Sequence, residues 1–262
     1  MKIDAGGLTT HCELHGPEGA PWLVFSHSLA CSAAMWAPQI ADFARDFRIL
    51  AYDTRGHGGT EAPPGPYTLD QLADDLHALL QALGVQQPHF CGLSMGGMIG
   101  QTYALRHPGR LRSLTLADTT SRYPATAAAV WGQRIETALA HGMGPLAEPT
   151  LQRWFTEGFR ARQPEVVERV RRLILDTPVA GYVGCSQALP SIDLTDRLHE
   201  IACPVLVICG AEDPGTPLAM SVEIQNHIPG STLAVLDAAH LSNLEQPDDF
   251  SAALGQFLEE CD

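Results

Sequence analysis

The stretch Phe90-Cys91-Gly92-Leu93-Ser94-Met95-Gly96-Gly97 decides how this chain of 262 residues folds. Residues 90–93 form a short apolar run typical of a buried strand, and residues 95–106 are predicted to form a helix. Glycines on both sides of Ser94 let the chain turn sharply between the two elements. The serine hydroxyl would then lie at the carboxyl edge of a sheet and at a helix N-terminus, as a nucleophile must.

Further short apolar runs, each bounded by turn-forming or charged residues, indicate buried parallel strands. They cover residues 22–26, 47–52, 114–117, 205–209 and 233–236. Between the second and third strands of the chain, Thr68 and Gln71 form a capping box ahead of leucines at helical spacing. Alternation of strand and helix predicts right-handed crossovers and a doubly wound α/β sheet. Residues 8–14 are expected to add antiparallel edge strands.

The pattern changes after about residue 120, because residues 121–190 contain helical periodicity and no strand-like run. We therefore predict a core domain made of residues 1–120 and 191–262, with residues 121–190 as a helical insertion. Charge differs between the two parts. The insertion carries 8 of the 16 basic and 6 of the 30 acidic residues, so it has a charge of +2 and the rest −16.

Composition excludes several classes of protein. With 45% apolar and 18% charged residues the chain should be globular, and its net charge of −14 disfavours nucleic acid and anionic membranes. No apolar run approaches the ~18 residues of a membrane helix, and the first residues lack the apolar region of a signal peptide. The 7 cysteines include no Cys-x-x-Cys pair, so neither disulfides nor a metal site is expected. We predict a cytoplasmic protein.

A serine nucleophile needs a general base and an orienting acid, which in this kind of fold follow it along the chain. The strand at 205–209 ends at Glu212 and Asp213, of which we favour Asp213. Glu212 could substitute, and Asp118 is a third, weaker candidate. His240 follows the next strand and is the predicted base, whereas His227 falls in a helical pattern.

Acyl transfer places negative charge on the carbonyl oxygen, so two backbone N–H groups must point at it. The residue after the nucleophile, Met95, supplies one. The loop after the first long strand, Ser26 to Ala30, takes the place of the usual His-Gly-x loop, and alignment on that loop gives the Leu29 amide as the second donor.

Several motifs spread over nearly the whole chain resemble the α/β-hydrolase family, and more narrowly its 3-oxoadipate enol-lactonases. They lie at residues 25–29, 52–58, 91–97, 153–156, 210–217 and 239–243. The resemblance implies a mostly parallel eight-stranded sheet flanked by helices, with residues 121–190 as a helical cap. It also implies hydrolysis of 3-oxoadipate enol-lactone in the β-ketoadipate pathway, by Ser-His-Asp covalent catalysis and without metal or organic cofactor. His27 and Ala30 depart from the family pattern, in which Asn and Gly are expected.

A carboxylate-bearing lactone would be repelled by the acidic core, so the insertion is where we expect a compensating cation. Trp131 and Arg134 are three residues apart in a helical pattern and should lie side by side. Arg134 could pair with the substrate carboxylate. Trp154 is a further candidate, and its neighbour Arg153 is the rival to Arg134.

Two other functions remain open from the sequence. A carboxylesterase or lactonase acting on another small ester would use the same Ser94, Asp213 and His240. A non-catalytic small-molecule receptor could share the fold, because a fold does not fix function. The sequence leaves the oligomeric state undetermined.

Overall fold

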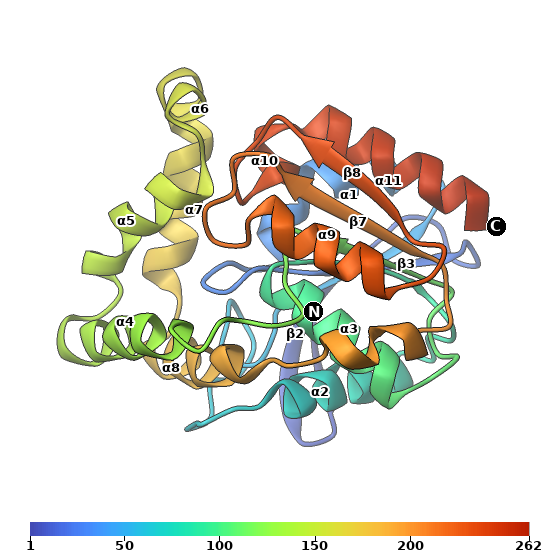
Figure 1. The fold of residues 1–262 in the computed structure, drawn as a ribbon. Helices are drawn as coiled ribbons and strands as arrows, with labels where there is room; N and C mark the ends of the chain where they lie inside the picture. The colour runs from blue at the N-terminus through green and yellow to red at the C-terminus, as the bar shows by residue number, and fades with distance from the viewer. Residues whose placement is uncertain (262) are drawn as a thin grey trace.

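The computed structural model describes residues 1–261, which fold around one eight-stranded sheet (Figure 1). The strands follow the spatial order β1-β2-β4-β3-β5-β6-β7-β8. Their bounds are β1 Lys2–Ala5, β2 Leu8–His15, β3 Trp22–Ser26, β4 Arg48–Tyr52, β5 His89–Leu93, β6 Ser113–Ala117, β7 Val205–Gly210 and β8 Thr232–Leu236. The predicted apolar runs match β3 to β8 to within one residue at each end.

Strand direction separates the two ends of the sheet. β2 pairs antiparallel with both β1 and β4, while β3 to β8 all run parallel. The central strands β5, β6 and β7 are buried along their whole length, because helices cover both faces. Their carboxyl ends therefore meet at one edge of the sheet, where loops can bring distant residues together.

Helices pack on the two faces of the sheet in two groups. α1 and α11 contact each other on one face, and α2 contacts α3 on the other, with α9 joined to that group through a 3₁₀ helix. Thr68 caps α2 by accepting the Gln71 N–H at 3.1 Å, as the capping box predicts. The bounds are α1 Ala37–Phe43, α2 Leu69–Ala82, α3 Met95–Arg106, α9 Leu218–His227, α10 Ser242–Glu245 and α11 Pro247–Cys261, with 3₁₀ helices at Ala33–Trp36, Leu189–Ser191 and Thr195–Glu200.

Between β6 and β7 the chain forms a group of helices that projects from one side of the sheet (Figure 1). They are α4 Ala127–His141, α5 Gly144–Trp154, α6 Glu157–Arg162, α7 Pro164–Asp176 and α8 Val179–Ala188. We call residues 127–188 the α4–α8 segment. It occupies the predicted insertion; the division into a core and a cap domain stays a prediction.

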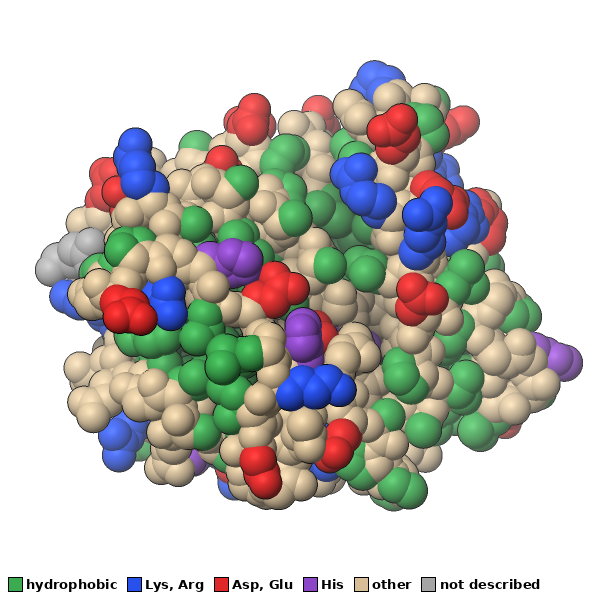
Figure 2. Space-filling model, turned by 180° about the vertical axis from the view of Figure 1, so that it is seen from behind, with side chains coloured by type: hydrophobic (Ala, Val, Ile, Leu, Met, Phe, Trp, Pro, Cys, Tyr) green, Lys and Arg blue, Asp and Glu red, His purple; other side chains and the backbone are tan. Residues whose placement is uncertain are grey.

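The surface is charged and polar around a well-filled interior. Seen from behind, Lys and Arg side chains gather with acidic ones over the region of α6 and α7, while other parts of this face show apolar groups (Figure 2). Every helix within residues 1–261 is too short or too polar to span a bilayer.

Candidate active site

Ser94 lies at the tight turn between β5 and α3. Its backbone has φ 57° and ψ −113°, an unfavourable conformation for a residue with a Cβ and a frequent mark of functional sites. The flanking glycines are required by close contacts, because a Cβ on Gly92 would lie 2.3 Å from the Gly96 oxygen. A Cβ on Gly96 would lie 2.1 Å from the Ser26 oxygen. The turn thus presses the start of α3 against the end of β3.

His240 and Asp213 complete a hydrogen-bonded chain with Ser94. His240 Nε2 lies 2.9 Å from Ser94 Oγ, and His240 Nδ1 lies 2.7 Å from Asp213 Oδ2. An ionised carboxylate only accepts hydrogen bonds, so Nδ1 carries the proton and Nε2 is free to accept from the serine hydroxyl. This is the relation between nucleophile, base and orienting acid that nucleophilic catalysis requires.

Asp213 is fixed in place by its own loop. Its Oδ1 accepts the N–H groups of Gly215 at 2.7 Å and Thr216 at 3.1 Å, and its Oδ2 accepts the Thr216 hydroxyl at 2.6 Å. Burial alone would raise the pKa of Asp213, but the charge of His240 and these hydrogen bonds bring it below its usual value. Asp213 is therefore a carboxylate at neutral pH.

The electrostatics of His240 favour its protonated form. Burial of the imidazole alone would lower its pKa, but the Asp213 carboxylate outweighs burial and raises the pKa above the ordinary histidine value. A base that becomes a cation during the reaction is stabilised by the same interaction.

The other candidates for acid and base lie elsewhere. Glu212 is exposed, and His227 is exposed at the end of α9. Asp118 is buried, but it accepts hydrogen bonds from the Gly210 N–H and the Ser242 hydroxyl. Among the acids considered from the sequence, Asp213 is the one hydrogen-bonded to His240.

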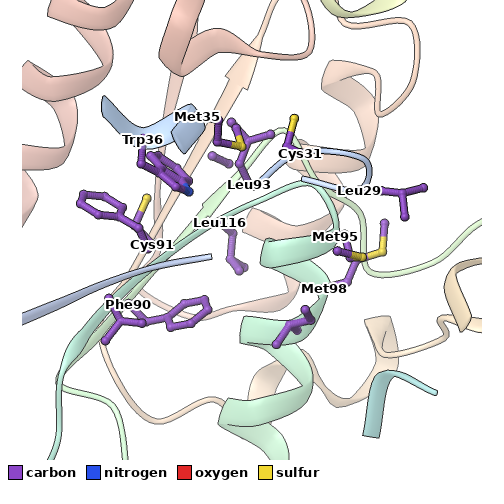
Figure 3. Close-up of a cluster of buried hydrophobic side chains, with 14 of the residues drawn as sticks. Leu29, Cys31, Met35, Trp36, Phe90, Cys91, Leu93, Met95, Met98 and Leu116 are labelled. Carbon is purple, nitrogen blue, oxygen red and sulfur yellow. The ribbon is translucent and has the colours of Figure 1, made fainter. Parts of the chain in front are cut away.

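The two predicted oxyanion donors come from neighbouring segments, the loop after β3 and the start of α3 (Figure 3). On either side of Leu29, the Ser28 N–H points to Met35 Sδ at 3.3 Å and the Ala30 N–H donates to His57 Nε2 at 3.0 Å. Within residues 1–261 the intervening Leu29 N–H has no acceptor. Met95 is the first residue of α3, where N–H groups have no partner inside the helix.

His57 and His27, which sequence reasoning gave no role, hold the loop that carries Leu29. His57 Nε2 accepts the Ala30 N–H, and His27 Nε2 accepts the Thr54 N–H at 2.9 Å. Burial lowers the pKa of His27, and it lowers that of His57 to about 3, so both rings are neutral and able to accept. The motif at residues 52–58, which includes His57, was noted in the sequence, but the contact of His57 with Ala30 could not be predicted from it.

A pocket of about 360 Å³ opens above Ser94 and His240, and the α4–α8 segment forms much of its wall. Predicted candidates Trp131, Arg134 and Trp154 all line it, and so does the rival Arg153. Among residues 1–261, none of those that line the pocket is acidic. The wall also includes Leu29, Tyr123, Val130, Met143, Leu146, Ile174, Tyr182 and Met220.

The two arginines of the pocket are cations without a carboxylate partner in its wall. The Arg134 guanidinium stacks 4.8 Å from the centre of the Trp131 ring, which fixes its position. Arg153 donates to Thr150 Oγ1 at 3.2 Å, and burial together with the charge of Arg134 lowers its pKa to about 10. An anion entering the pocket would relieve the repulsion between them.

Trp154, in the pocket wall, packs near His240. Its ring lies 6.1 Å from the His240 ring with an angle of 28° between the planes. Within residues 1–261, no three His, Cys, Asp or Glu side chains are grouped so that they could hold a metal ion.

The fold is that of the α/β hydrolases. A model of the alpha/beta hydrolase fold matches residues 21–247, and the chain belongs to this family. The chain is 41% identical to 3-oxoadipate enol-lactonase 2 of Acinetobacter baylyi, over 91% of this chain and 89% of that protein.

Solved structures agree with the sequence comparison. The enol-lactonase from Burkholderia xenovorans LB400 is 38% identical, with a TM-score of 0.96 over 99% of this chain and 100% of that one. A thermophilic esterase from Thermogutta terrifontis, solved with malate bound, is 30% identical, with a TM-score of 0.93 over 100% of this chain and 98% of that one.

Proposed function

We propose that this protein is a serine hydrolase that opens a small enol-lactone, 3-oxoadipate enol-lactone, to 3-oxoadipate. The observation that carries the proposal is the chain of hydrogen bonds from Ser94 through His240 to Asp213 at the floor of a pocket containing two arginines. Similarity to two enol-lactonases supports the choice of lactone.

In the proposed reaction Ser94 Oγ attacks the lactone carbonyl while His240 Nε2 takes its proton. Asp213 keeps the imidazole in the required tautomer and stabilises the cation. The Leu29 and Met95 N–H groups stabilise the oxyanion. His240 then gives its proton to the enol oxygen that leaves, and water releases the acid from Ser94 by the same sequence of steps.

We further infer that the substrate is an anion bound beneath the α4–α8 segment. Arg134 and Arg153 supply positive charge where the pocket wall contains no acidic residue, and a guanidinium can bind a carboxylate through two parallel hydrogen bonds. Trp131 and Trp154 would flank the ring of the lactone. Within residues 1–261 the seven cysteines form no disulfide bond with one another, which supports a reducing, cytoplasmic location.

A panel of three substrates tests this function: the carboxylated enol-lactone, an uncharged lactone of the same ring size, and an aryl ester. We expect the largest kcat/KM for the enol-lactone, and a loss on the order of 10⁴ to 10⁶ in Ser94→Ala on every substrate. A folded Ser94→Ala variant retaining more than about a tenth of wild-type turnover would remove the proposed mechanism.

A carboxylesterase is the second candidate, favoured by the similarity to the Thermogutta esterase and by the apolar part of the pocket wall. Preference for the uncharged aryl ester in the same panel would select it. A ligand receptor without catalytic activity would release no burst of phenol from the aryl ester, since no acyl-enzyme would form.

A further inference from the structure

The last residue of β6 and the two residues after it, 117–119, contact the turn that carries Ser94. The backbone carbonyl oxygen of Ala117 accepts the Ser94 N–H at 2.8 Å, and the Thr119 hydroxyl donates to the backbone carbonyl oxygen of Ser94 at 2.7 Å. Both backbone polar groups of the strained serine are therefore bonded to this strand end. Between these two contacts lies Asp118.

Asp118 reaches the two other loops of the site. Its Oδ1 accepts the N–H of Gly210, three residues before Asp213, at 2.7 Å. Its Oδ2 accepts the hydroxyl of Ser242, two residues after His240. The side chain is fully buried, and the backbone has a positive φ of 44°, which is uncommon for a residue other than glycine. One carboxylate thus joins the loop of the acid to the loop of the base.

We propose that Asp118 is a positioning residue of this hydrolase, which connects the Asp213 and His240 loops through its two hydrogen bonds and places a second negative charge near the imidazole. The inference rests on the proposed Ser94–His240 chemistry, but it does not depend on which ester is the substrate. Asp118 makes no hydrogen bond to His240, so it acts on the base through its charge and through the two loops.

The charges around the imidazole come from three elements. Asp213 follows β7 and raises the pKa of His240 most; Asp118, after β6, raises it further; and Arg153, on α5, lowers it. Asp118 in turn faces Asp213, His240 and the buried thiol of Cys91.

The charge state of Asp118 itself changes near neutral pH. Burial, followed by the repulsion of Asp213, raises its pKa to about 7, against the opposing effect of the His240 cation. Because the charges of Asp118 and His240 attract, each group's ionisation depends on the other's, and they titrate as a coupled pair.

The substitution Asp118→Asn removes the charge of the side chain and keeps its shape. In Asp118→Asn the side-chain oxygen can still accept the Gly210 N–H, and the amide can donate to the Ser242 hydroxyl, so both loops stay connected. Asp118→Ala removes the charge and both hydrogen bonds. Asp237→Asn is the matched control: it removes a carboxylate three residues before His240, but one that is exposed to solvent and screened.

The measurement is the rate at which a fluorophosphonate labels Ser94 between pH 5 and 9, which reports the serine and its base without requiring the lactone. In Asp118→Asn we expect the acidic limb of the rate to move to lower pH, with the plateau rate within about tenfold of wild type. In Asp118→Ala the plateau should fall by about 10²-fold, because the reacting groups lose their alignment. Asp237→Asn should follow the wild-type curve.

An acidic limb in Asp118→Asn that coincides with that of wild type would overturn the role of the charge. A folded Asp118→Ala variant with the wild-type plateau rate would overturn the positioning role; if that variant does not fold, the Asp118→Asn profile decides. Normal labelling with no turnover of the enol-lactone would remove the proposed substrate and leave the role of Asp118 standing. Wild-type protein that resists labelling would refute both.

Discussion

At the scale of single residues, the site depends on hydrogen-bonded pairs in which one residue determines the protonation state or the hydrogen bonding of the other. Asp213 determines which nitrogen of His240 carries a proton, and that in turn determines whether the imidazole can accept from Ser94. The same logic holds in the loop after β3, where neutral His57 accepts the Ala30 N–H, while the neighbouring Leu29 N–H has no acceptor within residues 1–261.

Asp213→Asn should lower kcat by on the order of 10⁴, because an amide can present its N–H to Nδ1 and favour the wrong tautomer. Glu212→Gln should leave kcat unchanged, since that carboxylate is exposed and turned to solvent. Steady-state rates of the two variants, with circular dichroism to check folding, measure this. A silent Asp213→Asn beside an inactive Glu212→Gln would move the acid by one residue.

The pH dependence of kcat/KM should follow the neutral form of His240. Because Asp213 raises the pKa of His240, activity should be full at alkaline pH and fall as pH drops through a midpoint above the ordinary value of ~6.5. In Asp213→Asn the midpoint of this fall in activity should move to lower pH, because the carboxylate charge that raises the pKa of His240 is gone. An initial-rate profile that stays flat down to pH 5 would contradict a histidine base.

Arg134→Ala should raise KM for the carboxylated lactone by about one to two orders of magnitude, if the lost contact contributes ~1.5 to 3 kcal/mol. Arg153→Ala should act in the same direction, while Arg169→Ala, an exposed arginine of α7, is the control. Hydrolysis of an uncharged aryl ester should be nearly unaffected by all three changes. Equal losses on both substrates would instead mean that Arg134 supports the wall through its stacking on Trp131.

At the scale of elements, the α4–α8 segment is attached to the rest of the chain on both sides of His240. The Leu241 N–H donates to the Trp154 oxygen at 3.0 Å, and the Ala239 N–H donates to Glu245 Oε2 at 3.1 Å. Glu245 also accepts the N–H and hydroxyl of Thr156, just before α6. The junction of α5 and α6 and the loop of the base are thereby one hydrogen-bonded unit.

A second attachment lies at α8. A Cβ on Gly181 would come within 1.8 Å of the Gly56 oxygen, so the backbone of α8 directly contacts the backbone of the loop after β4. Nearby, the Tyr67 N–H donates to the Gly184 carbonyl oxygen at 3.2 Å. The α4–α8 segment is thus held at the junction of α5 and α6 and again at α8, and these contacts set the distance between the pocket wall and Ser94.

Glu245→Ala should therefore weaken both stability and catalysis. It leaves the buried N–H of Ala239 and the partly buried N–H of Thr156 without acceptors, at a cost of ~1 to 3 kcal/mol for a buried group, and loosens the loop of His240. Denaturant unfolding and kcat measure the two effects, with Glu259→Ala on the exposed side of α11 as control. If unfolding changes but kcat per folded molecule does not, the contact serves stability alone.

The elements were largely predictable from the sequence, and the contacts between them were not. Fully buried strands appear as continuous apolar runs, so β5, β6 and β7 could be located to within a residue. Asp118 and Ser242, by contrast, are 124 residues apart, and Thr156 and Glu245 are 89 apart. Such pairs depend on how loops approach one another at the sheet edge, for which a single sequence carries no signal. The choice between Glu212 and Asp213 was open for the same reason.

At the scale of the whole molecule, opposing charges are arranged around one pocket. The chain carries −14 overall, yet the pocket wall holds two arginines and no acidic residue. Exposed charges are screened over about 8 to 10 Å at physiological salt, whereas the arginines act at contact distance on a bound ligand. We therefore expect the net charge to act on solubility, and the local pair of arginines to determine which ligands the pocket accepts.

The buried histidines also tie the stability of the whole fold to pH. His57 has a folded pKa of about 3 against ~6.5 unfolded, so the unfolded chain binds the extra proton between these values. His57 therefore does not lower the free energy of unfolding above about pH 6.5. As the pH falls from there towards 3, the free energy of unfolding decreases by about 1.4 kcal/mol per pH unit because of this group. Asp118, with a folded pKa of about 7, has the opposite sign, because the folded protein there binds the proton and stability decreases as pH rises from ~4 to 7.

The effects of His57 and Asp118 on the pH dependence of stability oppose one another in the wild-type protein. Removing His57 should therefore leave the effect of Asp118 visible. In His57→Gln the amide oxygen can still accept the Ala30 N–H, but the pH-linked penalty is gone. The difference in unfolding free energy between the variant and the wild type should therefore increase by about 2 kcal/mol, in favour of the variant, as the pH is lowered from 7 to 5. Urea unfolding at the two pH values measures the difference, and His141→Gln, at the exposed end of α4, should show none of it. A constant difference between His57→Gln and wild type at both pH values would mean that His57 is protonated as readily in the folded protein as in the unfolded chain.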